Sequence, residues 1–153
     1  MSFLNDTKVI YSHFGCLSTY MFGANTLSTQ PLAGLRLLVL EDEFLIAMDV
    51  EQICSDHGAE EVIICKTLSE ANSIGGDYDA AIIDLTLNGE STIPFAAELQ
   101  NRDLPFIFAS GYTDREDIAA DFPTIAMVGK PYSGEELVKA LLAALSSKLS
   151  VDR

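Results

Sequence analysis

Short apolar runs alternate with longer amphipathic segments from residue 35 to about residue 145. The runs are rich in Leu, Ile, Val, Phe and Ala, and their length suits strands that are buried on both faces. The segments between them carry apolar residues at helical spacing. We therefore expect strands at 35–40, 61–65, 80–83, 105–109 and 125–128, and helices at 69–74, 93–100, 114–120 and 134–145, with a further helix after residue 43.

The alternation predicts one α/β domain with a doubly wound, five-stranded parallel sheet. Parallel strands need a crossover connection, and the helix in each crossover covers one face of the sheet. In the helix after residue 43, we expect Phe44, Leu45, Met48 and Ile53 to share one face. In such sheets the functional crevice lies beyond the carboxyl ends of the strands. The residues that follow each strand are therefore the first candidates for a site.

The first 33 residues lack this alternation. They mix aromatic, hydroxyl and glycine residues without a sustained period, up to Gln30 and Pro31. We expect residues 1–33 to be an N-terminal extension outside the domain core, and residues 34–148 to form the domain. Only residues 146–153 follow the last expected helix. This predicts no output domain in the chain.

Polar side chains follow four of the five expected strands. Glu41 and Asp42 follow the first strand, Asp84 the third, Ser110 the fourth and Lys130 the fifth. Because the carboxyl ends of parallel strands share one edge, we expect these side chains to converge. Three carboxylates at one edge repel one another, and a divalent cation is the natural compensation. Oxygen ligands without histidine or cysteine favour Mg²⁺, or Mn²⁺, over zinc.

These residues suit phosphoryl chemistry when they are taken together. Asp84 can attack phosphorus as a nucleophile, while a metal ion, Lys130 and Ser110 neutralise charge on the phosphoryl oxygens. Each residue alone has an ordinary explanation. Glu41 and Asp42 are also typical of a helix start, and Asp84 of a turn. Only their joint placement at strand ends points to a site.

Four segments around these residues carry a resemblance to a known family. The chain resembles the receiver domains of two-component response regulators over about residues 35–147, through Val-Leu-Glu-Asp-Glu at 39–43, Ile-Ile-Asp-Leu at 82–85, Phe-Ala-Ser-Gly at 108–111 and Gly-Lys-Pro at 129–131. The resemblance implies a flavodoxin-like (βα)5 fold with strand order 2-1-3-4-5. Residues 88–91 and 105–112 resemble a stand-alone subgroup with a Phe-Ala-Thr/Ser-Gly-Tyr signature.

The resemblance also implies the role of each carboxylate. Asp84 would be the phosphoacceptor, and Asp42 and Asp84 would bind Mg²⁺ through their carboxylates. Glu41 would hold the ion through water, and the backbone carbonyl of Thr86 would supply a further ligand. These assignments make the metal site and the phosphorylation site one and the same.

Further residues are implied in phosphoryl contact and in switching. Ser110 and Lys130 would contact the phosphoryl group, and the peptide bond before Pro131 is a candidate for the cis isomer. The family usually turns an aromatic side chain of the fifth strand inward, but Met127 occupies that position here. Tyr112, two residues beyond Ser110, is a candidate to replace it.

Charge and cysteine content narrow the class of protein. The chain carries 9 Lys and Arg against 23 Asp and Glu, with a formal net charge of −14 and no basic cluster. This argues against direct nucleic-acid binding. Cys16, Cys54 and Cys65 are odd in number and form no Cys-x-x-Cys pair, which indicates a reducing, cytoplasmic compartment. No apolar run approaches the roughly 18–20 residues that span a membrane.

We therefore expect a bacterial single-domain response regulator. It would accept a phosphoryl group from a histidine kinase or a histidine phosphotransfer protein, and signal by protein contact or relay to an unknown downstream protein. It would catalyse only its own phosphorylation and dephosphorylation, as a monomer or a phosphorylation-dependent homodimer. One alternative is a pseudo-receiver that docks partners without phosphorylation. Another is a haloacid-dehalogenase-type phosphatase, but that family needs an aspartate where this chain has Thr86.

Overall fold

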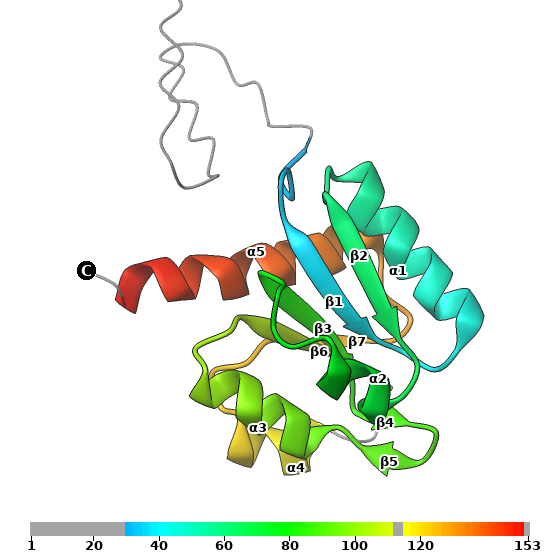
Figure 1. Cartoon of the computed structure of the whole chain (residues 1–153). Coiled ribbons are helices and arrows are strands. Elements are labelled where there is room, and N and C mark those ends of the chain that lie inside the picture. Colours follow the sequence, from blue (N-terminus) through cyan, green and yellow to red (C-terminus); the bar gives the residue numbers. More distant parts are fainter. Residues whose placement is uncertain (1–29, 112–114, 152–153) are drawn as a thin grey trace, which may run out of the picture.

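A five-stranded parallel sheet forms the centre of the protein. The computed structural model describes residues 30–111 and 115–151 (Figure 1). The sheet order is β2-β1-β3-β6-β7, which confirms the order expected for a receiver-type fold. Each expected strand is present, with its ends shifted by at most two residues. The strands are β1 (Arg36–Leu40), β2 (Glu61–Cys65), β3 (Ala80–Asp84), β6 (Phe106–Ser110) and β7 (Met127–Gly129).

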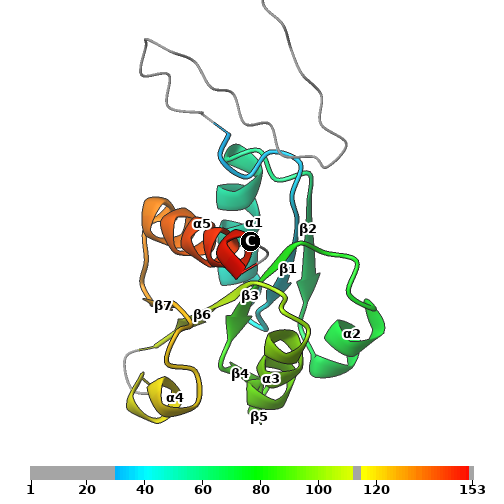
Figure 2. The same ribbon diagram turned by 90° about the vertical axis from the view of Figure 1, so that its left-hand side faces the viewer.

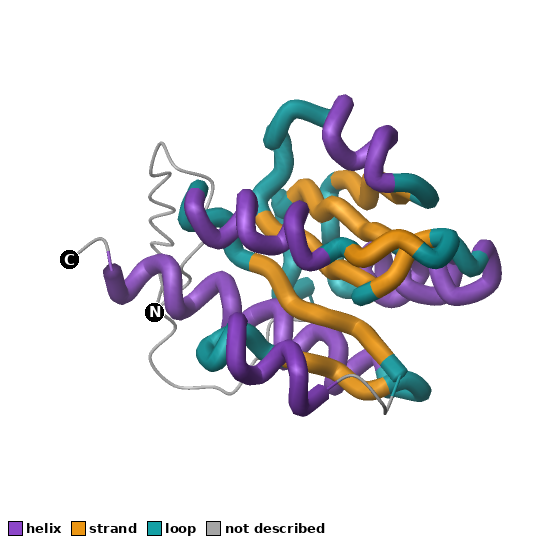
Figure 3. Tube along the Cα trace, turned by 90° about the horizontal axis from the view of Figure 1, so that it is seen from below, coloured by secondary structure: helices purple, strands orange, loops and turns teal. Residues whose placement is uncertain are grey.

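Helices cover both faces of the sheet, as a doubly wound fold requires (Figures 2 and 3). One face is covered by α1 (Phe44–Asp56) and α5 (Gly134–Val151). The other face is covered by three shorter helices, α2 (Leu68–Ser73), α3 (Ile93–Asn101) and α4 (Arg115–Asp121). Among the helices in the described ranges, none combines the length and the apolar character needed to cross a membrane.

Alternating side chains of the strands divide the core into two layers. In β6, Phe106 and Phe108 point toward α3 and α4, whereas Ile107 and Ala109 point toward α5. The rings of Phe106 and Phe108 meet edge to face with centroids 5.4 Å apart, and Phe122 packs edge to face against both. Such edge-on contacts add to the stabilisation from apolar burial. The sheet is therefore fixed on both faces, and its strand ends form a firm base for a site.

The domain begins earlier than the sequence pattern predicts. Leu32, which we expected in the extension, is fully buried in the same core layer as Val50 and Leu137. Its backbone N–H donates to the carbonyl of His57 over 2.9 Å. A single leucine after a proline leaves no periodic signal, which is why the boundary at residue 33 was wrong. Residues 1–29 lie outside the described residues.

The last helix is longer than expected. We placed its end near residue 145 and the domain end at 148, but α5 continues to Val151. The hydroxyl groups of Ser146 and Ser147 donate to the carbonyls of Leu142 and Ala143 over 2.9 and 3.0 Å. Both hydroxyl groups thus find acceptors within the helix itself, although serine is a weak helix former.

An additional hairpin, absent from the sequence prediction, follows β3. Its strands are β4 (Thr86–Leu87) and β5 (Glu90–Ser91), paired antiparallel. Asn88 and Gly89 form the turn, and their φ angles of 50° and 83° lie in the left-handed region. Two consecutive residues with positive φ are typical of a two-residue hairpin turn, and Asn-Gly is the preferred pair. The hairpin lies beside the carboxyl ends of the sheet strands (Figure 1).

Part of α1 faces solvent with large apolar side chains. Phe44, Leu45 and Met48 are 59%, 80% and 45% exposed. The face that α1 buries is made instead by the smaller residues Ala47, Val50 and Cys54. The expected helix is therefore confirmed. However, the cluster Phe44, Leu45 and Met48, called the α1 patch below, is not part of the core.

Leucine-to-alanine substitutions at two positions separate core from surface. Leu32→Ala should lower the free energy of unfolding by about 2–5 kcal/mol, because it removes a fully buried side chain and leaves a cavity. Leu45→Ala, at an 80% exposed position, should change it by less than about 0.5 kcal/mol. Urea unfolding measures both. Equal stability of the two variants would place Leu32 outside the core.

Candidate functional site

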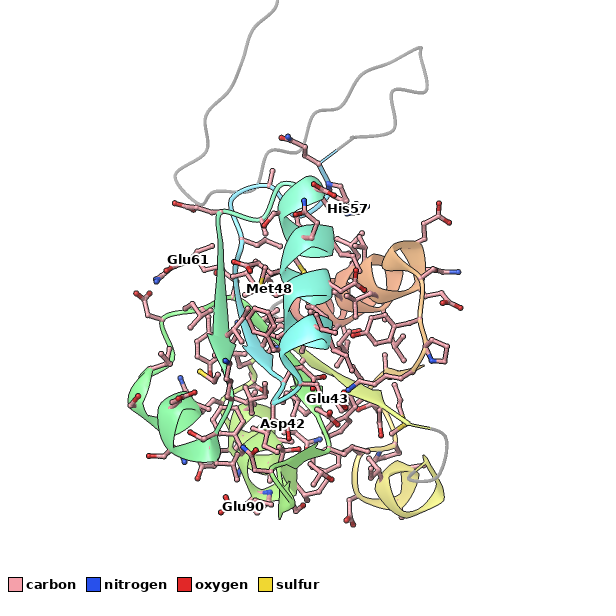
Figure 4. All side chains as sticks on the ribbon, turned by 90° about the vertical axis from the view of Figure 1, so that its right-hand side faces the viewer. Asp42, Glu43, Met48, His57, Glu61 and Glu90 are labelled. Atoms are coloured by element: carbon pink, nitrogen blue, oxygen red, sulfur yellow. The ribbon has the colours of Figure 1, made fainter. Side chains whose placement is uncertain are left out.

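Three carboxylates meet where two neighbouring strands end. β1 is followed directly by Glu41 and Asp42, and β3 ends at Asp84. The two strands pair in parallel, with Leu40 opposite Ile83, so their carboxyl ends lie side by side. Oxygen atoms of the three acids lie within 4.8 Å of one another. Figure 4 shows Asp42 and Glu43 beside the start of α1, with Glu90 of the hairpin farther below them.

Lys130 joins two of these carboxylates. Its Nζ donates to Glu41 Oε2 over 2.6 Å and to Asp84 Oδ2 over 2.8 Å. Its backbone N–H donates to the carbonyl of Ser110 over 2.7 Å, which ties the end of β7 to the end of β6. The Lys130–Pro131 peptide bond is cis, as we predicted from the resemblance. One ammonium group therefore bridges β1 and β3 from a third strand.

Burial and ion pairing have opposite effects on the pKa values of Glu41 and Lys130. Burial raises the pKa of the Glu41 carboxyl above its ordinary value, although the hydrogen bond from Lys130 works in the other direction. Burial would lower the pKa of the Lys130 ammonium, but its hydrogen bonds to Asp84 and Glu41 outweigh this effect and raise it. Among the residues that the structure describes, three carboxylates share the site with one ammonium, so this cluster remains short of positive charge.

The donor set suits a hard divalent cation. Glu41, Asp42 and Asp84 offer only carboxylate oxygen, which favours Mg²⁺ or Mn²⁺ over zinc. One oxygen of Glu41 accepts the N–H of Glu43 over 3.0 Å, and Oδ2 of Asp42 accepts the N–H of Asn88 over 3.0 Å. These hydrogen bonds orient the acids. The bond to Asn88 leaves the second oxygen of Asp42 unused, whereas the second oxygen of Glu41 accepts from Lys130. The residues present therefore fit such an ion.

Four further residues were predicted for the site, and the structure describes three of them. Ser110 ends β6, is 1% exposed, and follows Ala109, the residue that pairs with Asp84. Thr86 is the first residue of the hairpin, two positions after Asp84. Met127 lies in β7, half-buried against the apolar layer that contains Phe108, and is not among the hydrogen-bonding residues of the site. Tyr112 lies outside the described residues.

Two residues of the site were missed from the sequence. Asn88 donates to Asp42 from its backbone, and Thr92 donates from its hydroxyl to the backbone carbonyl of Asp84 over 2.6 Å. The Asn88-Gly89 pair is a hairpin signal that we had not used for structure. Thr92 gives no signal, because a buried threonine near a helix start is common.

The sequence comparison identifies one type of curated relative. No protein-family model matches the chain. Two matches, from two strains of Mycobacterium tuberculosis, are both described as transcriptional regulatory protein PdtaR. Each is 28% identical over 116 residues, which cover 72% of this chain and 57% of the relative. The chain thus spans little more than half the length of these relatives.

The solved structures define the fold. A response regulator receiver domain protein from Clostridium thermocellum superposes with a TM-score of 0.67 at 21% identity, covering 76% of this chain and 98% of its own. The anti-anti-sigma factor PhyR from Bartonella quintana gives 0.68 at 28% identity, covering 77% and 50%. The chain therefore has the receiver fold of response regulators, as its motifs indicated. Membership of the narrower Phe-Ala-Thr/Ser-Gly-Tyr subgroup stays a prediction.

Removing the bridging ammonium should destabilise the protein. Lys130→Met leaves the buried Glu41 without its cationic partner, which should lower the free energy of unfolding by about 1–3 kcal/mol in buffer without divalent ions. Lys139→Met, at an exposed position of α5, is the matched control and should have little effect. Urea unfolding at neutral pH measures the difference. Indistinguishable midpoints for the two variants would show that Lys130 does not hold the cluster.

Proposed function

We propose that the protein is a phosphorylation-controlled receiver in a two-component phosphorelay, with Asp84 as the phosphoacceptor. The observation that carries this proposal is the position of Asp84. It ends a buried strand, is held by Lys130, and shares a cluster with Glu41 and Asp42. The receiver fold, shared with solved response regulator domains, supports the same reading. The donor would be a phosphohistidine of a histidine kinase or phosphotransfer protein in the cytoplasm.

The reaction is a transfer between two side chains. A carboxylate oxygen of Asp84 attacks phosphorus, the bond from phosphorus to the donor imidazole breaks, and the imidazole leaves with the electron pair and takes up a proton. A bound Mg²⁺ would supply charge neutralisation on the phosphoryl oxygens. Glu41, Asp42, Asp84 and the carbonyl of Thr86 are the residues that would hold it. Lys130 would move its hydrogen bond from Asp84 to the new phosphoryl group.

The α1 patch gives the partner a place to dock. Phe44, Leu45 and Met48 are exposed directly after the acidic residues of the site, and the Lys66 ammonium lies 5.4 Å from the centre of the Phe44 ring. Large exposed apolar side chains beside a reactive carboxylate suit an apolar helical face that carries the donor histidine. Output would then pass by protein contact or by relay of the phosphoryl group, without turnover of other substrates.

The state of the site would be communicated through β6 and β7. Ser110 and Lys130 are joined through their backbones, so a phosphoryl group that draws both side chains would act on both strands. Met127, on β7, packs against the apolar layer that contains Phe108. We propose Met127, with Tyr112, in the role that an aromatic residue of the fifth strand fills in other receivers.

The phosphoacceptor is tested by intact mass. Acetyl phosphate with Mg²⁺ should add one phosphoryl group to the wild type, and Asp84→Asn should abolish the addition because an amide does not attack phosphorus. Asp121→Asn, at an exposed position of α4, should be labelled like the wild type. Absence of labelling in the wild type would favour a pseudo-receiver, and full labelling of Asp84→Asn would exclude Asp84.

The metal site is tested by thermal unfolding. If the dissociation constant is on the order of 1 mM, about 10 mM Mg²⁺ adds roughly 1.4 kcal/mol of stability. For a protein of this size this is a shift of about 3–6 °C in Tm. Asp42→Asn should remove most of the shift, whereas Glu136→Gln, exposed on α5, should not. An equal shift in the wild type and Asp42→Asn would exclude Asp42 as a ligand.

A further inference from the structure

The β4–β5 hairpin is attached to the acidic cluster at its turn. Asn88 donates its backbone N–H to Asp42 Oδ2 over 3.0 Å, and its side-chain Nδ2 donates to the carbonyl of Lys66 over 2.8 Å. The first bond reaches the loop after β1, and the second reaches the loop after β2. The left-handed turn at Asn88 and Gly89 aims both donors away from the hairpin. The turn is therefore fixed to two loops that are distant in sequence.

The hairpin is also fixed at its base. Thr92, fully buried, donates its hydroxyl to the carbonyl of Asp84 over 2.6 Å. Its backbone N–H donates to the carbonyl of Leu85 over 3.0 Å. Between base and turn, Leu87 is 1% exposed and packs into the core layer beneath α3. A short hairpin is marginal by itself in water, so these attachments define its position.

We propose that the hairpin is a clamp that sets the position of Asp42 relative to Asp84, with Asn88 and Thr92 as positioning residues. One end of the clamp holds an oxygen of Asp42, and the other holds the backbone of Asp84. Two carboxylates this close repel each other, and a donor on each side opposes their separation. This inference rests on the proposed function, because it assigns the clamp to the site that would bind Mg²⁺.

If the hairpin is a clamp, substitutions in it should weaken Mg²⁺ binding more than they lower the stability of the metal-free protein. Hydrogen-bonding partners that orient metal ligands commonly contribute 10-fold to 100-fold to metal affinity. If the hairpin only covered the core, substitutions in it would lower stability and leave the dissociation constant for Mg²⁺ unchanged. The two roles are therefore separated by measuring Mg²⁺ affinity and metal-free stability on the same variants.

The variants remove one attachment at a time. Thr92→Val keeps the shape of the side chain and removes the hydroxyl, whereas Thr92→Ser keeps the hydroxyl. Asn88→Gly keeps the left-handed turn and removes the bond to Lys66. Asn101→Gly, at the far end of α3, is the matched control for the cost of a new glycine.

Mg²⁺ titrations followed by thermal unfolding and by the backbone amide resonance of residue 88 test the clamp. Thr92→Val and Asn88→Gly should raise the dissociation constant for Mg²⁺ by about tenfold or more. Thr92→Ser should restore most of the wild-type value, and Asn101→Gly should leave it unchanged. In the wild type, Mg²⁺ should shift the amide resonance of Asn88, because that N–H is bonded to a ligand carboxylate.

The outcomes distinguish the clamp from the function on which it rests. If the wild type binds Mg²⁺ and the variants bind it equally well, the clamp is refuted and the metal site stands. If the wild type binds no Mg²⁺, the proposed function fails together with the clamp. If Thr92→Val does not fold, Asn88→Gly and the amide resonance decide alone, and an unchanged affinity with an unmoved resonance refutes the clamp.

Discussion

The site depends on one ammonium group that holds acids from two strands. Glu41 follows β1, Asp84 ends the neighbouring strand β3, and Lys130 reaches both from the end of a third strand, β7. Without a cation, acids at this edge would repel one another and would pay the cost of burial unpaired. The two packed core layers fix the strand ends. The acids are therefore held together by charge and kept in place by packing.

The same arrangement allows the site to respond to a bound cation and to a phosphoryl group. A site with three carboxylates and one ammonium attracts a cation, and a phosphoryl group on Asp84 would compete for Lys130. Because Lys130 is bonded to Ser110 through the backbone, a change at Asp84 reaches the ends of β6 and β7. The hairpin carries a second connection, from Asp84 through Thr92 and Asn88 to Asp42. A change at Asp84 is thus linked both to the ends of β6 and β7 and to the β4–β5 hairpin.

The sequence predicted those parts of the structure where a pattern recurs along the chain, or where several residues together indicate one site. Apolar runs recur at each strand, and the strand-end residues Asp84, Ser110 and Lys130 support one another as a set. What escaped prediction rests on single tertiary contacts. Leu32 lies in the core without belonging to any helix or strand, and Thr92 joins the site through the hydrogen bond from its hydroxyl to the carbonyl of Asp84. Helical spacing could not tell which face of α1 the smaller residues would bury, so the α1 patch was found only in the structure.

Chemical trapping of the phosphorylated protein shows directly whether Asp84 carries the phosphoryl group. An aspartyl phosphate is an acyl phosphate, which borohydride reduces to the alcohol, so the modified aspartate becomes homoserine. Protein treated with acetyl phosphate and Mg²⁺ would be reduced, digested and mapped by peptide mass spectrometry. Homoserine is expected at position 84, with Asp42 and Asp79 unmodified. Homoserine at another position, with position 84 unmodified in labelled protein, would contradict it.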